Sequence, residues 1–220
     1  MLIVLALVFS MFSSIFAQAA LPFEQTFDTD MEQMVGIDSS GNQFWHFVPY
    51  GNGPGSAQMW GTDGTNHVPN VDYLITPGFD LSSTTNEVLS FETVKEYSPG
   101  PLQLMYSTDY DGNNFSSATW IDISDRATFA SANDWYNWIP SGNIDISDIN
   151  GTNVHIAFRY ESTTEFSGAW EIDNIKIFES NLPEILSMQR TPQHMIDCAT
   201  SVSITAEIPY TGGTINNVFL

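Results

Sequence analysis

Apolar and polar residues alternate in short runs along most of the chain between positions 20 and 180. The clearest run lies at 154–160, where Val, Ile, Phe and Tyr occupy every second position, and similar runs lie at 89–93 and 102–106. Alternation with a period of two predicts β-strands with one buried face, and no window shows a sustained helical period. The pattern therefore predicts an all-β domain.

Six further segments rich in β-branched and aromatic residues are predicted as strands: 45–48, 57–60, 72–76, 120–123, 135–139 and 142–146. Turns are indicated by clusters of Pro, Gly, Asn and Asp at 51–55, 98–101, 111–114 and 150–153. Many short strands at this spacing are typical of sandwiches and jelly rolls. The predicted fold is a jelly-roll β-sandwich over residues 20–180.

The closing strand of this domain, 168–178, carries a break in its alternation. Apolar residues keep one phase up to Ile172 and the other phase from Ile175. A β-bulge at 173–174 would absorb this one-residue slip and re-aim the side chain that sits on it. We therefore expect a bulge that points Asp173 toward a cation.

The two ends of the chain differ from this domain. The apolar run at 2–16 and the small residues after it predict a secretory signal peptide, residues 1–19, that is cleaved after Ala19. The run is too short for a transmembrane anchor, so we expect a secreted or cell-surface protein whose mature chain inserts into no membrane.

Residues 181–220 alternate again and predict the start of an immunoglobulin-like module. Such a module needs about 100 residues, so we expect covalent continuation into further modules.

The charge balance is strongly acidic, with 26 Asp and Glu, five Lys and Arg, and a net charge of −21. Nucleic-acid binding needs clustered basic residues, so the balance argues against a nucleic-acid partner. The many carboxylates could bind divalent cations, which prefer carboxylate oxygens as ligands. The alternative is that the negative charge only keeps the protein in solution. Cys198 is the single cysteine, so core burial must supply stability without an internal disulfide.

Six segments together form a recognisable ordered pattern: 22–27, 72–81, 89–91, 106–109, 154–160 and 170–177. Read in this order, they resemble the cleaved-adhesin and choice-of-anchor J domains of Bacteroidota-type surface proteins. The resemblance implies a jelly-roll sandwich, often calcium-bearing and non-catalytic, in exported adhesins, peptidases or nucleases. It also fits an immunoglobulin-like module downstream and a type IX sorting domain at the far end.

Four acidic residues are candidate calcium ligands: Glu24, Asp28, Asp63 and Asp173. A jelly roll brings its first and last strands together, which would place Glu24 near Asp173. Two carboxylates and backbone carbonyls would begin the six to eight oxygen ligands that calcium takes. The alternative is that Asp173 bonds its own backbone and Glu24 is solvated.

Exposed aromatic residues are candidates for sugar binding, because sugars stack on flat aromatic faces. The candidates are Trp45, Trp60, Tyr97, Trp120, Trp135, Tyr136 and Trp138. The run with Trp135, Tyr136 and Trp138 is the predicted ligand platform. The alternative is core packing, since the opposite parity of its two tryptophans would bury at least one of them.

Glu171 and Asp173 raise a catalytic alternative, because jelly-roll β-glucanases carry Glu-x-Asp-x-x-Glu on one strand. Lys176 stands where the second glutamate belongs, and its ammonium cannot replace a carboxylic acid near neutral pH. We therefore predict no enzymatic activity. The leading interpretation is a non-catalytic adhesion or recognition module that binds a glycan or a host protein. The alternative is a structural spacer that presents a downstream enzyme or sorting domain.

Overall fold

The computed structural model describes residues 18–97, 100–180, 187–191 and 203–207. The chain divides into two compact units between Glu179 and Ser180. In the described part of the second unit, β13 (Ser187–Thr191) pairs antiparallel with β14 (Ser203–Glu207). The rest of the predicted immunoglobulin-like module lies outside the described residues. Among the described residues, no helix is long and apolar enough to cross a bilayer.

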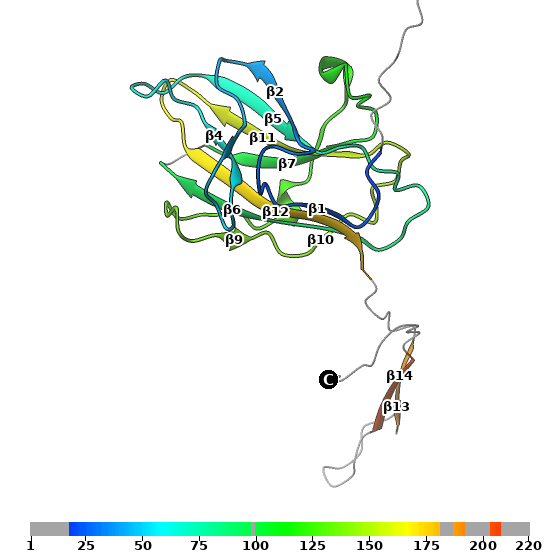
Figure 1. Ribbon diagram of the computed structural model, residues 1–220. Helices are drawn as coiled ribbons and strands as arrows, with labels where there is room; N and C mark the ends of the chain where they lie inside the picture. The colour runs from blue at the N-terminus through cyan, green and yellow to red at the C-terminus, as the bar shows by residue number, and fades with distance from the viewer. Residues whose placement is uncertain (1–17, 98–99, 181–186, 192–202, 208–220) are drawn as a thin grey trace, which may run out of the picture. The chain divides into compact units, whose positions relative to one another are not determined.

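The first unit is a sandwich of two antiparallel sheets (Figure 1). The seven-stranded sheet has the order β10-β6-β12-β4-β3, with β1 also paired to β12 and β9 to β6. Its strands are β1 (Phe23–Gln25), β3 (His46–Val48), β4 (Ser56–Trp60), β6 (Glu87–Glu96), β9 (Ile139–Pro140), β10 (Ile144–Asp145) and β12 (Ala169–Glu179). The fold is therefore the predicted all-β sandwich.

The five-stranded sheet has the order β2-β5-β11-β7-β8. Its strands are β2 (Val35–Ser40), β5 (Asn70–Ile75), β7 (Leu102–Ser107), β8 (Ile121–Asp122) and β11 (His155–Ser162). Two 3₁₀-helices, η1 (Phe115–Ser117) and η2 (Ser124–Arg126), flank β8.

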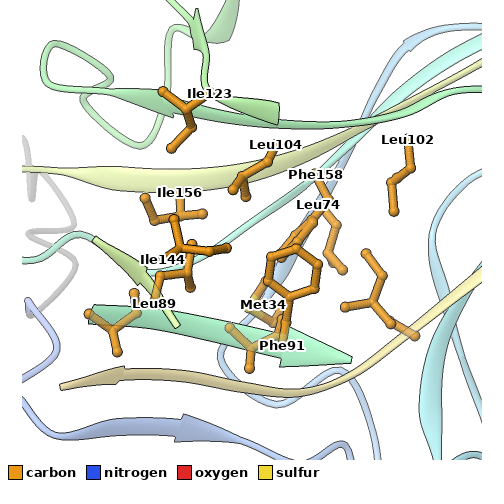
Figure 2. Close-up of a cluster of buried hydrophobic side chains, with 14 of the residues drawn as sticks. Met34, Leu74, Leu89, Phe91, Leu102, Leu104, Ile123, Ile144, Ile156 and Phe158 are labelled. Atoms are coloured by element: carbon orange, nitrogen blue, oxygen red, sulfur yellow. The ribbon is translucent and has the colours of Figure 1, made fainter. Parts of the chain in front are cut away.

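The core lies between the sheets and is filled by the alternate residues that the sequence pattern selects. In Figure 2, Leu104 and Phe158 of the five-stranded sheet face Leu89 and Phe91 of the other sheet, and all four are almost fully buried. Apolar contact of this kind is the main favourable term in folding a chain without disulfides. The predicted alternation at 89–93, 102–106 and 154–160 is confirmed.

The bulge in β12 is also confirmed. The pairing of β12 with β6 shifts register between Asp173 and Lys176, and Asn174 has a left-handed φ of 53°. On its other side, β12 pairs with β4 as far as Ile172 and with β1 from Ile175. The bulge therefore lies where one neighbouring strand replaces another, and it keeps both isoleucines in the core.

One predicted strand was largely wrong, and one observed strand was not predicted. The predicted strand 135–139 forms only at its last residue, Ile139, which begins β9; its start is a turn, because Asp134 Oδ1 accepts the Tyr136 N–H at 3.0 Å. β2 was not predicted, because its side chains are mostly exposed and show no alternation. It forms at the sheet edge through pairing with β5.

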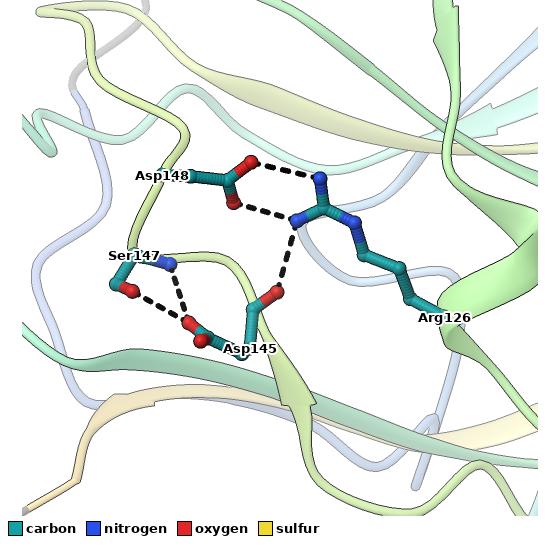
Figure 3. Close-up of polar contacts among 4 residues, drawn as sticks. All are labelled: Arg126, Asp145, Ser147 and Asp148. Carbon is teal, nitrogen blue, oxygen red and sulfur yellow. Dashed lines mark hydrogen bonds and ion pairs between the residues drawn. The ribbon is translucent and has the colours of Figure 1, made fainter.

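One surface ion pair connects the two sheets at one end (Figure 3). The Arg126 guanidinium of η2 donates to both carboxylate oxygens of Asp148 at 2.6 and 2.8 Å, and to the Asp145 carbonyl at 3.1 Å. Asp145 ends β10 of the seven-stranded sheet. η2 is attached to the other sheet because Leu104 N–H donates to Ser124 Oγ at 2.9 Å.

Candidate binding groove

A groove of about 640 Å³ lies on the outer face of the seven-stranded sheet. We call it the aromatic groove. Its side-chain lining is Tyr50, Asn52, Gln58, Trp60, Tyr97, Trp135, Tyr136, Trp138 and Glu171. These residues come from β4, β12, the end of β6 and two loops, so the groove exists only in the folded domain.

Strand alternation determines which side chains form the floor of the groove. Ala57 and Met59 of β4 point into the core, so Gln58 and Trp60 point outward. Gln58 pairs across the sheet with Glu171 of β12. Their side chains therefore share the outer face.

The aromatic residues form the walls. Trp60 and Tyr97 stack with their ring centroids 4.9 Å apart and their planes 10° apart. Trp135 meets Tyr97 edge to face at 6.3 Å, and Tyr136 is 94% exposed. The turn that carries Trp135 is held to the end of β6, since Asp134 N–H donates to the Lys95 carbonyl at 3.0 Å.

Glu171 is the charged group of the floor and is only 3% exposed. Gln58 Nε2 donates to its Oε1 at 2.7 Å, and Ser56 Oγ donates to its Oε2 at 3.0 Å. Burial raises the pKa of this carboxyl, while the hydrogen bonds from Gln58 and Ser56 and the nearby His46 act in the opposite direction. Each carboxyl oxygen keeps a further lone pair that could accept a ligand hydroxyl.

The aromatic candidates separate into two groups. Trp60, Tyr97, Trp135, Tyr136 and Trp138 all line the groove, and neither tryptophan of the 135–138 run is fully buried. Trp45 belongs to the core, and Trp120 lies on a loop that packs against the outer face of the other sheet. Sequence reasoning missed Tyr50 and Gln58, and it considered Glu171 only for catalysis. The outward phase of β4 was the available signal for Gln58.

The four candidate calcium ligands do not form one cluster. Glu24 forms an ion pair with Lys176 across the paired strands β1 and β12, with Glu24 Oε1 2.6 Å from Lys176 Nζ. Asp63 closes its own turn, where the backbone N–H groups of Thr65 and Asn66 donate to Oδ1 at 2.8 and 2.7 Å. The backbone hydrogen bonds of Asn66 and Thr65 lower the pKa of Asp63.

Asp173 is 1% exposed on the bulge, and its carboxylate accepts hydrogen bonds from the N–H groups of Asn52 at 3.1 Å and Asn174 at 2.6 Å. Burial raises its pKa to about 7, and the charges of Glu92 and Asp28 contribute to the rise. Of the three proposed partners, only the negative charge of Asp28 contributes to this rise. Across the described residues, no group of three or more His, Cys, Asp or Glu could hold a metal ion. The predicted set of four does not fit a calcium site.

A family model described as a domain of unknown function, DUF5017, matches residues 78–192, more than half of the chain. The chain belongs to the DUF5017 family. The match covers most of the sandwich, including β6, β11 and β12, and extends through β13. No curated protein matches the DUF5017 chain.

Two solved adhesin domains share the fold of this DUF5017 protein. The K1 cleaved adhesin domain of Lys-gingipain from Porphyromonas gingivalis W83 is 19% identical over 73% of this chain and 99% of that domain, with a TM-score of 0.52. The K3 cleaved adhesin domain of the same protein is 17% identical over 72% and 98%, with a TM-score of 0.50. At these identities the likeness establishes a cleaved-adhesin-like β-sandwich.

Proposed function

We propose that this domain is a non-catalytic carbohydrate-binding module and that the aromatic groove is its ligand site. One observation carries the proposal: exposed aromatic rings surround a floor of hydrogen-bonding side chains on one sheet face. Concave sites with aromatic walls and a few fixed polar groups are the usual form of small-ligand sites in proteins.

The chemistry of the groove suits a saccharide. A pyranose ring has flat C–H faces, which pack against Tyr136 and Trp135, and a rim of hydroxyl groups. Glu171 and Gln58 supply acceptors for those hydroxyls at the floor. The existing hydrogen bonds hold both side chains in place, so little side-chain entropy would be lost when a ligand binds.

The same geometry argues against hydrolysis. Glycoside hydrolysis needs two carboxyl groups that flank the scissile bond. Asp173, the next carboxyl along β12, is buried and accepts hydrogen bonds from Asn52 and Asn174. Lys176, at the position of the second glutamate in the β-glucanase pattern, is paired with Glu24.

The proposed setting of this module is the outside of the cell. The predicted signal peptide at 1–19 supports export, and the acidic composition suits a solvated surface module. Its partner would be an extracellular glycan.

Glycan binding by the full chain tests the proposal, with calorimetric titration after a glycan array. Trp135→Ala and Tyr136→Ala should each weaken binding about 2- to 10-fold, because one aromatic contact contributes about 0.5–1.5 kcal/mol. Ile121→Ala is the matched control, because Ile121 is a 45% exposed apolar side chain on β8 of the other sheet.

Equal glycan binding by the two groove variants and the parent would contradict the groove assignment. Absence of binding to every glycan on the array would favour the structural-spacer alternative.

A further inference from the structure

The aromatic groove has a neighbouring hollow on each side along the same sheet face. The first, which we call the edge hollow, has a volume of about 470 Å³ and shares Gln58 and Trp60 with the groove. The second, which we call the amide hollow, has a volume of about 450 Å³ and shares Asn52 with it. Gln58 and Trp60 form the border between the edge hollow and the groove. Asn52 forms the border between the groove and the amide hollow, where its Nδ2 donates to Glu92 Oε2 at 2.5 Å.

Their order follows the order of the strands. The edge hollow begins at His46 of β3, the groove lies over Gln58 of β4 and Glu171 of β12, and the amide hollow reaches Glu92 of β6. These strands are neighbours in the order β3-β4-β12-β6. The line of hollows therefore crosses the strands over three inter-strand spacings, about 14 Å in all.

Each of the two outer hollows is lined by an exposed residue. Phe44, in the edge hollow, is 60% exposed, and Asn143, in the amide hollow, is also exposed. β3 is the terminal strand of the sheet, so no further strand closes the outer side of the edge hollow. A ligand that lies along the whole line could therefore continue past the edge hollow.

Each hollow supplies its own contacts. Phe44 provides an aromatic face in the edge hollow, in edge contact with the His46 ring at 6.3 Å. The amide hollow presents the side chains of Asn143 and Asn174. Asn174 Nδ2 donates to Glu92 Oε2 at 2.8 Å, which fixes its side chain.

The charges along the line are negative. Glu171 lies at the floor of the groove and Glu92 in the amide hollow. Lys176 is the one Lys or Arg that lines any of the three hollows, and it is ion-paired with Glu24 at 2.6 Å. A carboxylated or sulfated ligand would face uncompensated repulsion there.

We propose that the three hollows form one continuous cleft that binds an internal stretch of an uncharged, linear glycan, about three or four sugar residues long. This inference rests on the proposed carbohydrate-binding function. It specifies a chain-internal binding mode and an uncharged ligand class, neither of which follows from the aromatic groove alone.

The test titrates the full chain with size-fractionated neutral oligosaccharides from β-glucan, xylan and mannan, and with galacturonic acid oligomers of equal length. Affinity for at least one neutral series should rise about 2- to 10-fold per added residue from the dimer and level off near the tetramer. Phe44→Ala should lower affinity for the hexamer while leaving affinity for the dimer unchanged.

A dimer that binds as tightly as the hexamer would overturn the continuous cleft but leave the proposed function intact. Galacturonic acid oligomers that bind as tightly as neutral ones would overturn the ligand class. If no oligosaccharide of any length or charge binds, the proposed function itself fails, and the cleft assignment fails with it.

Discussion

The outer faces of the two sheets both carry tyrosine and tryptophan side chains, but these side chains are covered on one sheet and open to solvent on the other. On the five-stranded sheet, a loop folds over the face and packs Tyr110, Phe115 and Trp120 against Tyr73 and Ala157, which makes a second, smaller core. On the seven-stranded sheet, the corresponding aromatics stay beside an open groove. The comparison shows that an aromatic residue on a sheet face becomes core or binding surface according to what the next loop covers.

The hydrogen bonds of the two loops explain the difference. The covering loop, between β7 and β8, is held against its sheet by two hydrogen bonds. Asp109 Oδ1 accepts the Thr119 N–H at 2.7 Å, and Asn153 Nδ2 donates to the Tyr110 carbonyl at 2.6 Å. The loop beside the groove is attached at Asp134, and Tyr136 extends into solvent from its turn.

The largest expected effect is on the free energy of unfolding, for a substitution on the covered face of the five-stranded sheet. Tyr110→Ala should lower the free energy of unfolding by about 3 kcal/mol, because it empties the centre of the small core. Tyr136→Ala on the open face should change it by less than about 0.5 kcal/mol. Urea unfolding of both variants measures the difference, and equal losses would show that the two faces are not distinct in packing.

The second expected effect is a pH dependence on the five-stranded sheet. Asp72 is buried, and its burial and the opposing Asp38 raise its pKa to about 7. The native state therefore keeps a proton that the unfolded chain, with a pKa near 3.9, has already lost. Stability should fall as the pH rises from about 4 to about 7.

Asp72→Asn should reduce this slope, because the amide has no proton to release; the slope that remains comes from Asp173, whose pKa burial also raises to about 7. Unfolding by urea at a series of pH values measures it, with Asp63→Asn as the control on an exposed turn. A slope that is the same in parent and Asp72→Asn would remove Asp72 as its source.

The smallest expected effect concerns calcium at the open sheet. Calcium binding stays a prediction, now limited to Asp173 and Asp28, whose charge acts on Asp173. Glu24 is ion-paired with Lys176, and Asp63 lies in a separate turn that its carboxylate closes. If it holds, a chelator should lower the melting temperature of the parent by about 2–5 °C. Asp173→Ala should abolish the difference and Asp63→Ala should preserve it. A melting curve of the parent that is unchanged by chelator would contradict calcium binding.

Much of the fold was predictable because its signals are local. Alternation in single strands predicted the core faces of β6, β7 and β11, and the phase slip predicted the bulge at Asp173 and Asn174. The edge strand β2 and the turn at Trp135 were not predictable in this way. The first depends on pairing with β5, and the second depends on a hydrogen bond from Tyr136 to Asp134.

The candidate site was predictable only in pieces. Trp135, Tyr136 and Trp138 carried a recognisable aromatic pattern, but nothing in the sequence joined them to Gln58 and Glu171. Asp63 was a candidate to complete a calcium site begun by Asp173, yet its carboxylate closes its own turn by accepting the Asn66 N–H.

By itself, the sequence determined an acidic, disulfide-free β-sandwich with a bulged closing strand, because composition and period-two alternation are properties of neighbouring residues. Only the tertiary structure decided which aromatics are covered, which carboxylates meet, and that three hollows lie in line across β3, β4, β12 and β6. Those outcomes depend on strand order and loop placement, which bring together residues more than 100 positions apart, such as Gln58 and Glu171.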